Sequence, residues 1–207
     1  MADMILSKFI FISKEQKLSV CLLKKCISFV LLVLTILMII AAIKKPTELH
    51  EKEVKELNKE RPLIFLIRHS ERCDRTEEQC LSDKKGITVR GALKARQYGE
   101  RFNNLFTEYV PYSSDTVRTK QTATYFSEKK TRVLSALSDC DESIYKTIKK
   151  IASDNKNTVI FTHNHCLTFI AKNLRNWKYK PDYLDTLVMH VQDGRFYLDG
   201  RLTPLHH

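Results

Sequence analysis

Residues 62–72 read PLIFLIRHSER, and this stretch decides the fold. Its apolar part, LIFLI at 63–67, contains no polar residue. A short continuous run of this kind is typical of a strand buried on both faces of a parallel sheet. The run ends directly in Arg68 and His69, so the strand places a cation and an imidazole at one edge of the sheet.

A second run of the same kind spans residues 158–162, which read TVIFT, and it ends in His163. Ligand sites of open α/β sheets form outside the carboxyl ends of the strands. Parallel strands have those ends at the same edge. We therefore expect His69 and His163 to lie close together at a ligand-binding edge.

The remainder of 62–207 alternates between strand-like and helix-like segments. Apolar residues at helical spacing predict helices at 88–106, 116–126, 143–152 and 165–174. Further strands are expected at 110–114, weakly at 132–137, and at 187–191 and 195–198, which flank the hairpin signal Asp193-Gly194. The alternation predicts an α/β fold of three layers, with a mostly parallel sheet and helices on both faces.

Residues 27–43 read ISFVLLVLTILMIIAAI and carry no charge. A bilayer core about 30 Å thick needs roughly 17–25 such residues. A cleaved signal peptide is the alternative, but its apolar part is typically about 7–15 residues long and ends in small residues. The length of the run and the poor cleavage site at 40–43 favour an uncleaved membrane anchor.

The charge before this segment predicts its orientation. Residues 1–26 contain five lysines, and a basic flank of this kind stays in the cytoplasm. The segment at 44–61, a linker or short helix, and the domain at 62–207 are then expected outside the cytoplasm. The four cysteines of that domain, an even number, fit an oxidising compartment.

The net charge of +11 on 207 residues raises nucleic acid as a possible partner. Seven lysines against two acidic residues in 1–45 account for much of this excess. The rest is spread without long basic runs, and no zinc-finger spacing, basic zipper or RNA-binding motif occurs. We therefore do not expect a nucleic-acid partner.

The residues near the two histidines suit phosphoryl transfer. A neutral imidazole can attack phosphorus and form a covalent intermediate. The transferring group needs positive charge around its oxygens, and arginine supplies it through a planar fork that stays charged. Neither a metal nor an organic cofactor is expected, because arginines replace the cation that such reactions usually use.

Four stretches resemble motifs of the histidine phosphatase superfamily, in the same order. They are RHSER at 68–72, ITVRG at 87–91, SSDTVRTKQTA at 113–123 and FTH at 161–163. The superfamily usually has glycine where Ser70 stands. The resemblance covers nearly all of 62–170.

This resemblance implies roles for individual side chains. His69 would be the nucleophile, and Arg68, Arg118 and His163 would hold the phosphoryl group. Arg72 would bind phosphate as well, unless it pairs with its neighbour in the sequence on a solvated turn. The product would leave after water hydrolyses a phosphohistidine.

The proton donor is the least determined role. The leaving alkoxide needs a proton, so a carboxylic acid must stand near it. Superfamily members often place this acid after the second arginine motif, which favours Glu142. Asp139, Asp141, Glu71 and Asp74 are the alternatives.

Two further features of the cysteines and histidines affect the site. His163, His165 and Cys166, with Cys140, can also be interpreted as zinc ligands, although this spacing is unusual for a structural site. Four cysteines permit three pairings, and function favours Cys73–Cys80 with Cys140–Cys166, since both bridges would brace segments next to the motifs.

A closer resemblance is to the bacterial lipopolysaccharide core heptose(II)-phosphate phosphatase group. It rests on ERCDR at 71–75, CLSDK at 80–84, FTHNHCLT at 161–168 and KPDYLD at 180–185. It implies a periplasmic phosphomonoesterase at the inner membrane, with the phosphorylated lipopolysaccharide core as its substrate. A mutase of the same fold and a non-catalytic phosphate-binding envelope sensor are the alternative functions.

Overall fold

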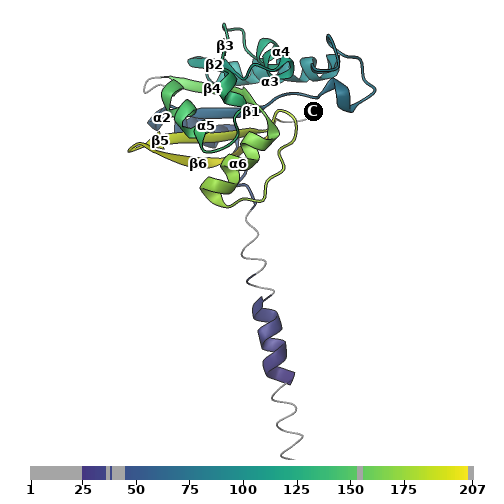
Figure 1. Ribbon diagram of the computed structural model, residues 1–207. Coiled ribbons are helices and arrows are strands. Elements are labelled where there is room, and N and C mark those ends of the chain that lie inside the picture. The colour runs from purple at the N-terminus through teal and green to yellow at the C-terminus, as the bar shows by residue number, and fades with distance from the viewer. Residues whose placement is uncertain (1–24, 36–37, 39–44, 153–155, 205–207) are drawn as a thin grey trace, which may run out of the picture. The chain divides into compact units, whose positions relative to one another are not determined.

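The computed structural model describes residues 25–35, 38, 45–152 and 156–204, and the chain divides into units at 1–43 and 44–207 (Figure 1). In the first unit, residues 25–35 are helical and expose apolar side chains such as Phe29 and Leu31. Among the described residues, no helix is long and apolar enough to cross a bilayer. Most of the basic segment at 1–26 and much of 27–43 lie outside the described residues.

The second unit is built on one sheet, which has six strands within the described residues. They are β1 (Ile64–Arg68), β2 (Tyr109–Ser113), β3 (Arg132–Val133), β4 (Asn157–Thr162), β5 (Thr186–Gln192) and β6 (Arg195–Leu202). The spatial order is β3-β2-β4-β1-β5-β6. The pairs from β3 to β1 are parallel, whereas β5 is antiparallel to both β1 and β6. The sheet is therefore mixed, with its parallel part where the sequence predicts it.

The predicted hairpin is confirmed. β5 and β6 are joined at Asp193 and Gly194, which both have positive φ angles, of 50° and 71°. Two-residue turns with positive φ at both positions match the twist of the flanking strands, and Asp-Gly adopts them readily.

Helices cover both faces of the sheet. They are α2 (Glu51–Glu60), α3 (Val89–Leu105), α4 (Val117–Phe126), α5 (Ser143–Ile151) and α6 (Asn164–Arg175). Alternate residues of β1 point to opposite faces: Phe65 and Ile67 lie in a core with α2, α3 and α4, and Ile64 and Leu66 lie in another with α5 and α6. Continuous apolar strands are thus explained by burial on both sides.

The predicted strand at 132–137 is wrong over most of its length. Only Arg132 and Val133 pair with β2, and both are exposed at the edge of the sheet. Residues Ser135–Ser138 form a short 3₁₀ turn, η2, and its residue Leu137 is fully buried. The turn buries the Leu137 side chain, whereas the two residues that pair at the edge of the sheet are exposed.

Part of the predicted linker packs on the domain. Val54 of α2 is fully buried in the core, and the Leu49 N–H donates to the Arg201 carbonyl at 2.8 Å. Gly200 permits this close approach, because a Cβ there would lie 2.4 Å from the Leu49 side chain. Residues 47–60 therefore belong structurally to the domain that follows them.

Candidate active site

His69 follows the last residue of β1, and its backbone is held from three sides. The His69 N–H donates to the Thr162 carbonyl at 3.0 Å, and the Ser70 N–H donates to Thr122 Oγ1 at 2.9 Å. On the other side, the Arg68 N–H donates to the Asp185 carbonyl at 2.9 Å. These bonds fix the strand end between β4, α4 and the start of β5.

The His69 ring is oriented for nucleophilic attack. Its Nδ1 lies 2.8 Å from the Ser70 carbonyl oxygen. Because a carbonyl can only accept, Nδ1 carries the proton and Nε2 keeps its lone pair. Burial lowers the pKa of His69 to about 3, so the ring is neutral near pH 7.

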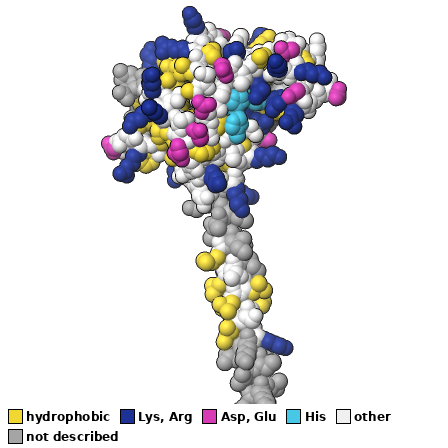
Figure 2. Space-filling view, viewed as in Figure 1, with side chains coloured by type: hydrophobic (Ala, Val, Ile, Leu, Met, Phe, Trp, Pro, Cys, Tyr) yellow, Lys and Arg dark blue, Asp and Glu magenta, His cyan; other side chains and the backbone are white. Residues whose placement is uncertain are grey.

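His163 stands immediately before α6, and its ring centre is 5.6 Å from that of His69. Its Nε2 is 3.2 Å from Ser114 Oγ, at the end of β2. Burial, followed by the charge of Arg118, lowers the pKa of His163 to about 4. The structure thus brings together the two histidines that follow the apolar runs. Figure 2 shows histidine side chains gathered on one face of the domain, beside lysines and arginines.

Two half-buried arginines lie near the histidines. The Nε atoms of Arg68 and Arg118 are buried, and neither donates a hydrogen bond to any residue that the structure describes. Burial lowers the pKa of each arginine, and both positive charges act to lower the pKa of His69. Buried donors without an acceptor are costly, and an anion beside them would remove that cost.

Arg72, the third predicted phosphate ligand, lies close to this group. Its Nε and Nη2 donate to the two carboxylate oxygens of Asp74, at 2.8 and 2.5 Å. Its charge also acts to lower the pKa of Arg118 and of His163. Arg72 is therefore within electrostatic range of the histidine cluster and held by a carboxylate.

Tyr183 is a site residue to which the sequence-based prediction assigns no role. The Arg68 guanidinium carbon lies 4.0 Å from the centre of its ring, and the His69 ring centre is 6.0 Å away. The next residue, Leu184, has a φ angle of 65°, a conformation that costs a non-glycine residue roughly 1–3 kcal/mol. Its N–H donates to the Arg68 carbonyl, which fixes this turn against the strand.

Ser70 departs from the glycine usual in the superfamily motif, and the fold accommodates it. Its hydroxyl donates to the Gly91 carbonyl at 2.7 Å. A Cβ on Gly91 would lie 3.0 Å from that hydroxyl oxygen, so the glycine at this position of α3 leaves room for the serine.

Comparison with known proteins agrees with this geometry. The family model of the histidine phosphatase superfamily (branch 1) matches residues 64–145. The lipopolysaccharide core heptose(II)-phosphate phosphatase of Salmonella arizonae is 52% identical over 151 residues, which cover 72% of this chain and 75% of that protein. The protein of the same name from Escherichia coli O139:H28 is 53% identical over 152 residues, with 72% and 76% covered.

The chain belongs to the histidine phosphatase superfamily.

Solved structures of the superfamily share the fold at low sequence identity. The protein histidine phosphatase SixA, complexed with tungstate, has a TM-score of 0.53 and 15% identity, over 69% of this chain and 97% of that one. A mycobacterial glucosyl-3-phosphoglycerate phosphatase has a TM-score of 0.52 and 11% identity, over 67% and 97%. These likenesses support the α/β architecture of this histidine phosphatase.

The predicted proton donor, Glu142, does not lie with the histidines. Its carboxylate accepts from Asn173 Nδ2 at 3.1 Å, near the end of α6. His163 stands ten residues earlier, which at 1.5 Å per residue is about 15 Å along that helix. Glu142 directly precedes α5, and its side chain is bound at the far end of α6.

The alternative carboxylates differ in their surroundings. Asp141 accepts from the Ser143 N–H at the start of α5, and exposed Asp139 forms no side-chain hydrogen bond within the described ranges. Glu71 accepts from Thr88 and Arg90, and the Arg90 guanidinium lowers its pKa. Asp74 is bound by Arg72, which likewise lowers its pKa. Of these, Asp74 lies with the arginines that are predicted to bind phosphate.

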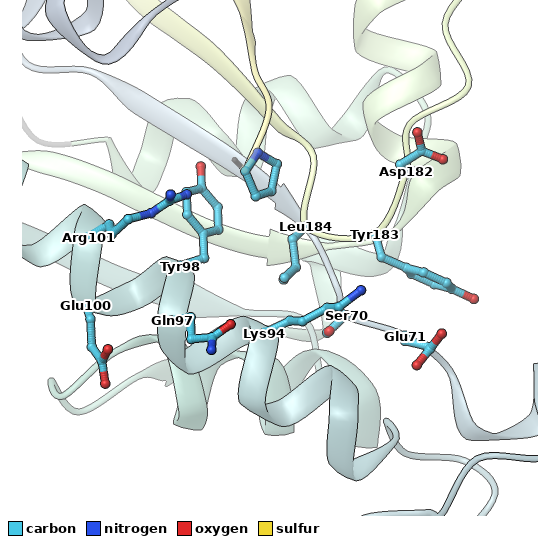
Figure 3. Close-up of a pocket in the computed structure, with 11 residues that line it drawn as sticks. Ser70, Glu71, Lys94, Gln97, Tyr98, Glu100, Arg101, Asp182, Tyr183 and Leu184 are labelled. Carbon is cyan, nitrogen blue, oxygen red and sulfur yellow. The ribbon is translucent and has the colours of Figure 1, made fainter. Parts of the chain in front are cut away.

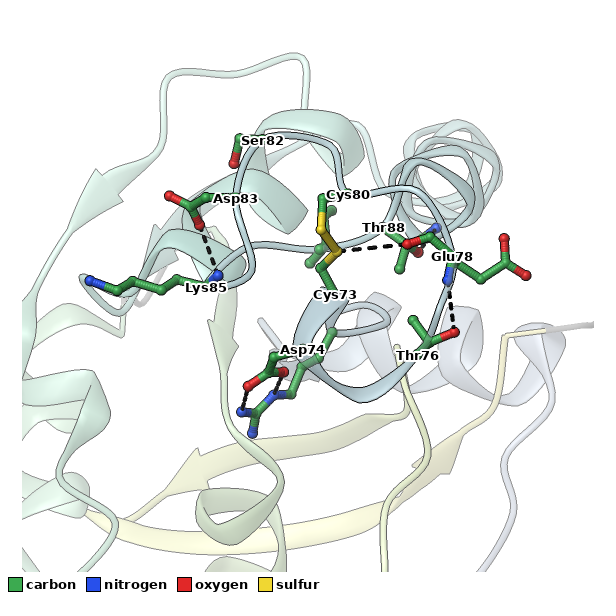
Figure 4. Close-up of a disulfide and its surroundings, with 12 residues drawn as sticks. Cys73, Asp74, Thr76, Glu78, Cys80, Ser82, Asp83, Lys85 and Thr88 are labelled. Carbon is green, nitrogen blue, oxygen red and sulfur yellow. Dashed lines mark hydrogen bonds and ion pairs between the residues drawn. A yellow bond between two sulfur atoms is a disulfide. The ribbon is translucent and has the colours of Figure 1, made fainter.

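Both predicted disulfides are present. Cys73–Cys80 closes the loop after Arg72 (Figure 4). Cys140–Cys166 joins the segment between η2 and α5 to α6, one turn after His163. His165 lies close to the second bridge, so that Cys140, His165 and Cys166 have their ligand atoms within 4.8 Å. A metal at that cluster would need thiolates, and both sulfurs are engaged in the bridge.

The two buried histidines predict how stability depends on pH. Each has a pKa near 6.5 when unfolded, but about 3 (His69) and about 4 (His163) when folded. As the pH falls below 6.5, the unfolded chain binds protons on both rings and the folded chain does not. The free energy of unfolding should fall by up to about 1.4 kcal/mol per pH unit for each ring.

Denaturant unfolding of the phosphatase between pH 7 and 5 measures this slope. The double variant His69→Gln/His163→Gln lacks both rings and should show a clearly flatter dependence over the same range. An equal slope in the two proteins would mean that other groups cause the loss.

Proposed function

We propose that this chain is a phosphomonoesterase that removes phosphate from heptose(II) of the lipopolysaccharide inner core, through a phosphohistidine on His69. One observation carries the catalytic part: a neutral imidazole with a free Nε2 stands beside two half-buried arginines, whose buried Nε donors have no acceptor among the described residues. The substrate is supported by relatives of that name with half or more of the aligned residues identical.

The reaction follows from this geometry. His69 Nε2 forms a bond to phosphorus while the bond from phosphorus to the sugar oxygen breaks. Arg68 and Arg118 hold the phosphoryl oxygens and neutralise their charge. Water then attacks phosphorus, the P–N bond breaks, and its electron pair returns to Nε2.

Asp74 is the proton donor in this proposal, in place of Glu142. Without substrate, Arg72 donates two hydrogen bonds to the Asp74 carboxylate and lowers the pKa of Asp74. When Arg72 turns to the incoming phosphate, this restraint is lost and the carboxyl can take up a proton. It then protonates the sugar oxygen as that oxygen leaves, and afterwards accepts a proton from the attacking water.

Asp74→Asn should separate substrates by their leaving groups. For a sugar phosphate, whose alkoxide needs a proton, kcat/KM should fall about 10²- to 10⁴-fold. For p-nitrophenyl phosphate, whose nitrophenolate leaves unprotonated, kcat/KM should change little, because it reports only the steps up to phosphoryl transfer and not the later attack of water. Steady-state kinetics on both substrates measure this, with Glu142→Gln as the matched variant outside the site. Equal losses on the two substrates would exclude Asp74 as the donor.

The function itself is tested with the full chain in detergent and core oligosaccharide phosphorylated on heptose(II). We expect release of inorganic phosphate in amounts equal to the heptose phosphate consumed. A His69→Gln preparation made in parallel reports contaminating activity. Absence of release would contradict the proposal, as would transfer of the phosphate to another position of the sugar.

We further propose that the domain lies in the periplasm and is held at the inner membrane by residues 27–43. The uncharged sequence, the basic flank before it and the exposed apolar side chains at 27–34 support an anchor. Two disulfides in the domain support an oxidising compartment.

Reporter fusions test this topology. Alkaline phosphatase joined after His207 should be active, and the same reporter joined after Lys24 should be inactive, since it folds only outside the cytoplasm. The full chain should fractionate with inner membranes. A freely soluble protein that begins near Lys44 would show instead that the segment is cleaved.

A further inference from the structure

A pocket of about 510 Å³ adjoins the catalytic residues. It lies between α3, the loop that carries Tyr183, and Pro204, and its lining includes Ser70 and Glu71, the residues directly after the nucleophile (Figure 3). Its volume is within the range of roughly 300–1,000 Å³ that small-molecule sites have. In the proposed function, Arg68 and Arg118 bind the phosphoryl group outside this pocket. The pocket is therefore available for another part of the substrate.

The lining combines hydrogen-bond donors and acceptors on one face of α3 and on the facing loop. Lys94 and Gln97 provide an ammonium and an amide, and Glu100 and Asp182 provide carboxylates. None of the side chains of Lys94, Gln97 and Glu100 hydrogen-bonds to another residue in the part of the chain that the structure describes. Leu184 and the buried ring of Tyr98 supply apolar surface.

This chemistry fits a neutral, hydroxyl-rich ligand. Each hydroxyl both donates and accepts, so it can satisfy the amide and the carboxylates together. The cations Lys94 and Arg101 are balanced by the carboxylates of Glu100 and Asp182, so a second phosphate would gain no net attraction. An apolar ligand would leave Lys94 and Glu100 without partners. Glu71 is neutralised by Arg90 and adds no free charge.

Tyr183 connects the pocket to the phosphate site. Its ring lines the pocket and also lies over the Arg68 guanidinium, 4.0 Å from its carbon. In Figure 3, the Lys94 side chain extends along the pocket toward Ser70, on the side where Glu71 and Tyr183 lie. A phosphate on Arg68 therefore leaves the sugar that bears it next to the opening of this pocket.

We propose that the pocket binds an unphosphorylated sugar ring of the oligosaccharide, adjoining the phosphorylated heptose, through its hydroxyl groups. The inference rests on the proposed function, because it assumes an oligosaccharide substrate. It assigns substrate selection to α3 and the Tyr183 loop, outside the group that performs the chemistry.

The double variant Lys94→Ala/Gln97→Ala tests the pocket. We expect KM for phosphorylated core oligosaccharide to rise about tenfold or more, as loss of hydrogen bonds to hydroxyls predicts, with a much smaller change for p-nitrophenyl phosphate. Asn104→Ala removes an exposed amide from α3 outside the pocket and should leave both values unchanged. Unchanged KM for the oligosaccharide, or an equal loss on both substrates, would overturn the inference.

A binding measurement separates this inference from the proposed function. Calorimetry of the full chain in detergent with dephosphorylated core oligosaccharide should detect binding that the double variant weakens about tenfold. If wild-type protein binds this sugar but releases no phosphate from the phosphorylated form, the proposed function is wrong and the inference about the pocket is retained. If phosphate is released but wild type and variant bind the sugar equally, the inference about the pocket is wrong and the proposed function is retained.

Discussion

Replacing His69 with glutamine is expected to lower kcat for the sugar phosphate by about 10⁴-fold or more. The amide can occupy much of the space of the imidazole, but it has no lone pair that attacks phosphorus. The arginines and His163 remain, so substrate should still bind and KM should change far less than kcat. Phosphate release under saturating substrate measures the effect.

The fold should survive this change. His69 follows a strand end, and the bonds that its own N–H donates to Thr162 and that the Ser70 N–H donates to Thr122 do not depend on the ring. Circular dichroism and thermal unfolding at pH 7 check this. His50→Gln, at an exposed position before α2, is the matched control and should keep full activity. Activity of His69→Gln within tenfold of wild type would exclude a covalent role for this residue.

Arg118→Met is expected to lower kcat/KM for the sugar phosphate by about 10²- to 10³-fold. The buried Nε of Arg118 has no acceptor within the described residues, and its charge acts on both histidines. In the proposed mechanism, this substitution removes a positive charge that stabilises the transferring phosphoryl group. Arg118→Lys should recover only part of the loss, since an ammonium lacks the planar fork.

Lys120→Met is the control for this experiment, because it removes a charge from an exposed position two residues along the same helix. It should alter kcat/KM by less than about threefold if long-range charge is unimportant, as screening by salt predicts. Similar losses for Lys120→Met and Arg118→Met would assign the effect to net charge instead of to a phosphate contact.

The parallel part of the fold and the meeting of the histidines were predictable from sequence, for a specific reason. The run at 63–67 is wholly apolar and the run at 158–162 has an apolar centre, as is typical of strands covered on both faces, and a histidine follows each run within two residues. Parallel pairing then forces the ends together. The Asp193-Gly194 turn was also predictable from the sequence, because few residue pairs adopt two positive φ angles.

Other parts of the site were not predictable, because they depend on packing. Glu142 follows the arginine motif in sequence, but the direction of the chain before α5 carries it toward Asn173. Tyr183 lies on an irregular loop whose geometry depends on the left-handed conformation of Leu184, and leucine gives no sign of such a conformation in sequence. The edge at 132–137 resembles a strand in sequence, yet only two residues pair.

The covalent step is the central claim, and trapping it tests the claim most directly. Full-length protein is mixed with core oligosaccharide carrying radioactive phosphate, quenched in alkali during turnover, and digested for mass spectrometry. We predict an alkali-stable, acid-labile phosphoryl group on the peptide that contains His69, bonded through Nε2, and none on His163. Phosphate on another residue, or rapid turnover with no phosphorylated peptide at any time point, would contradict the account.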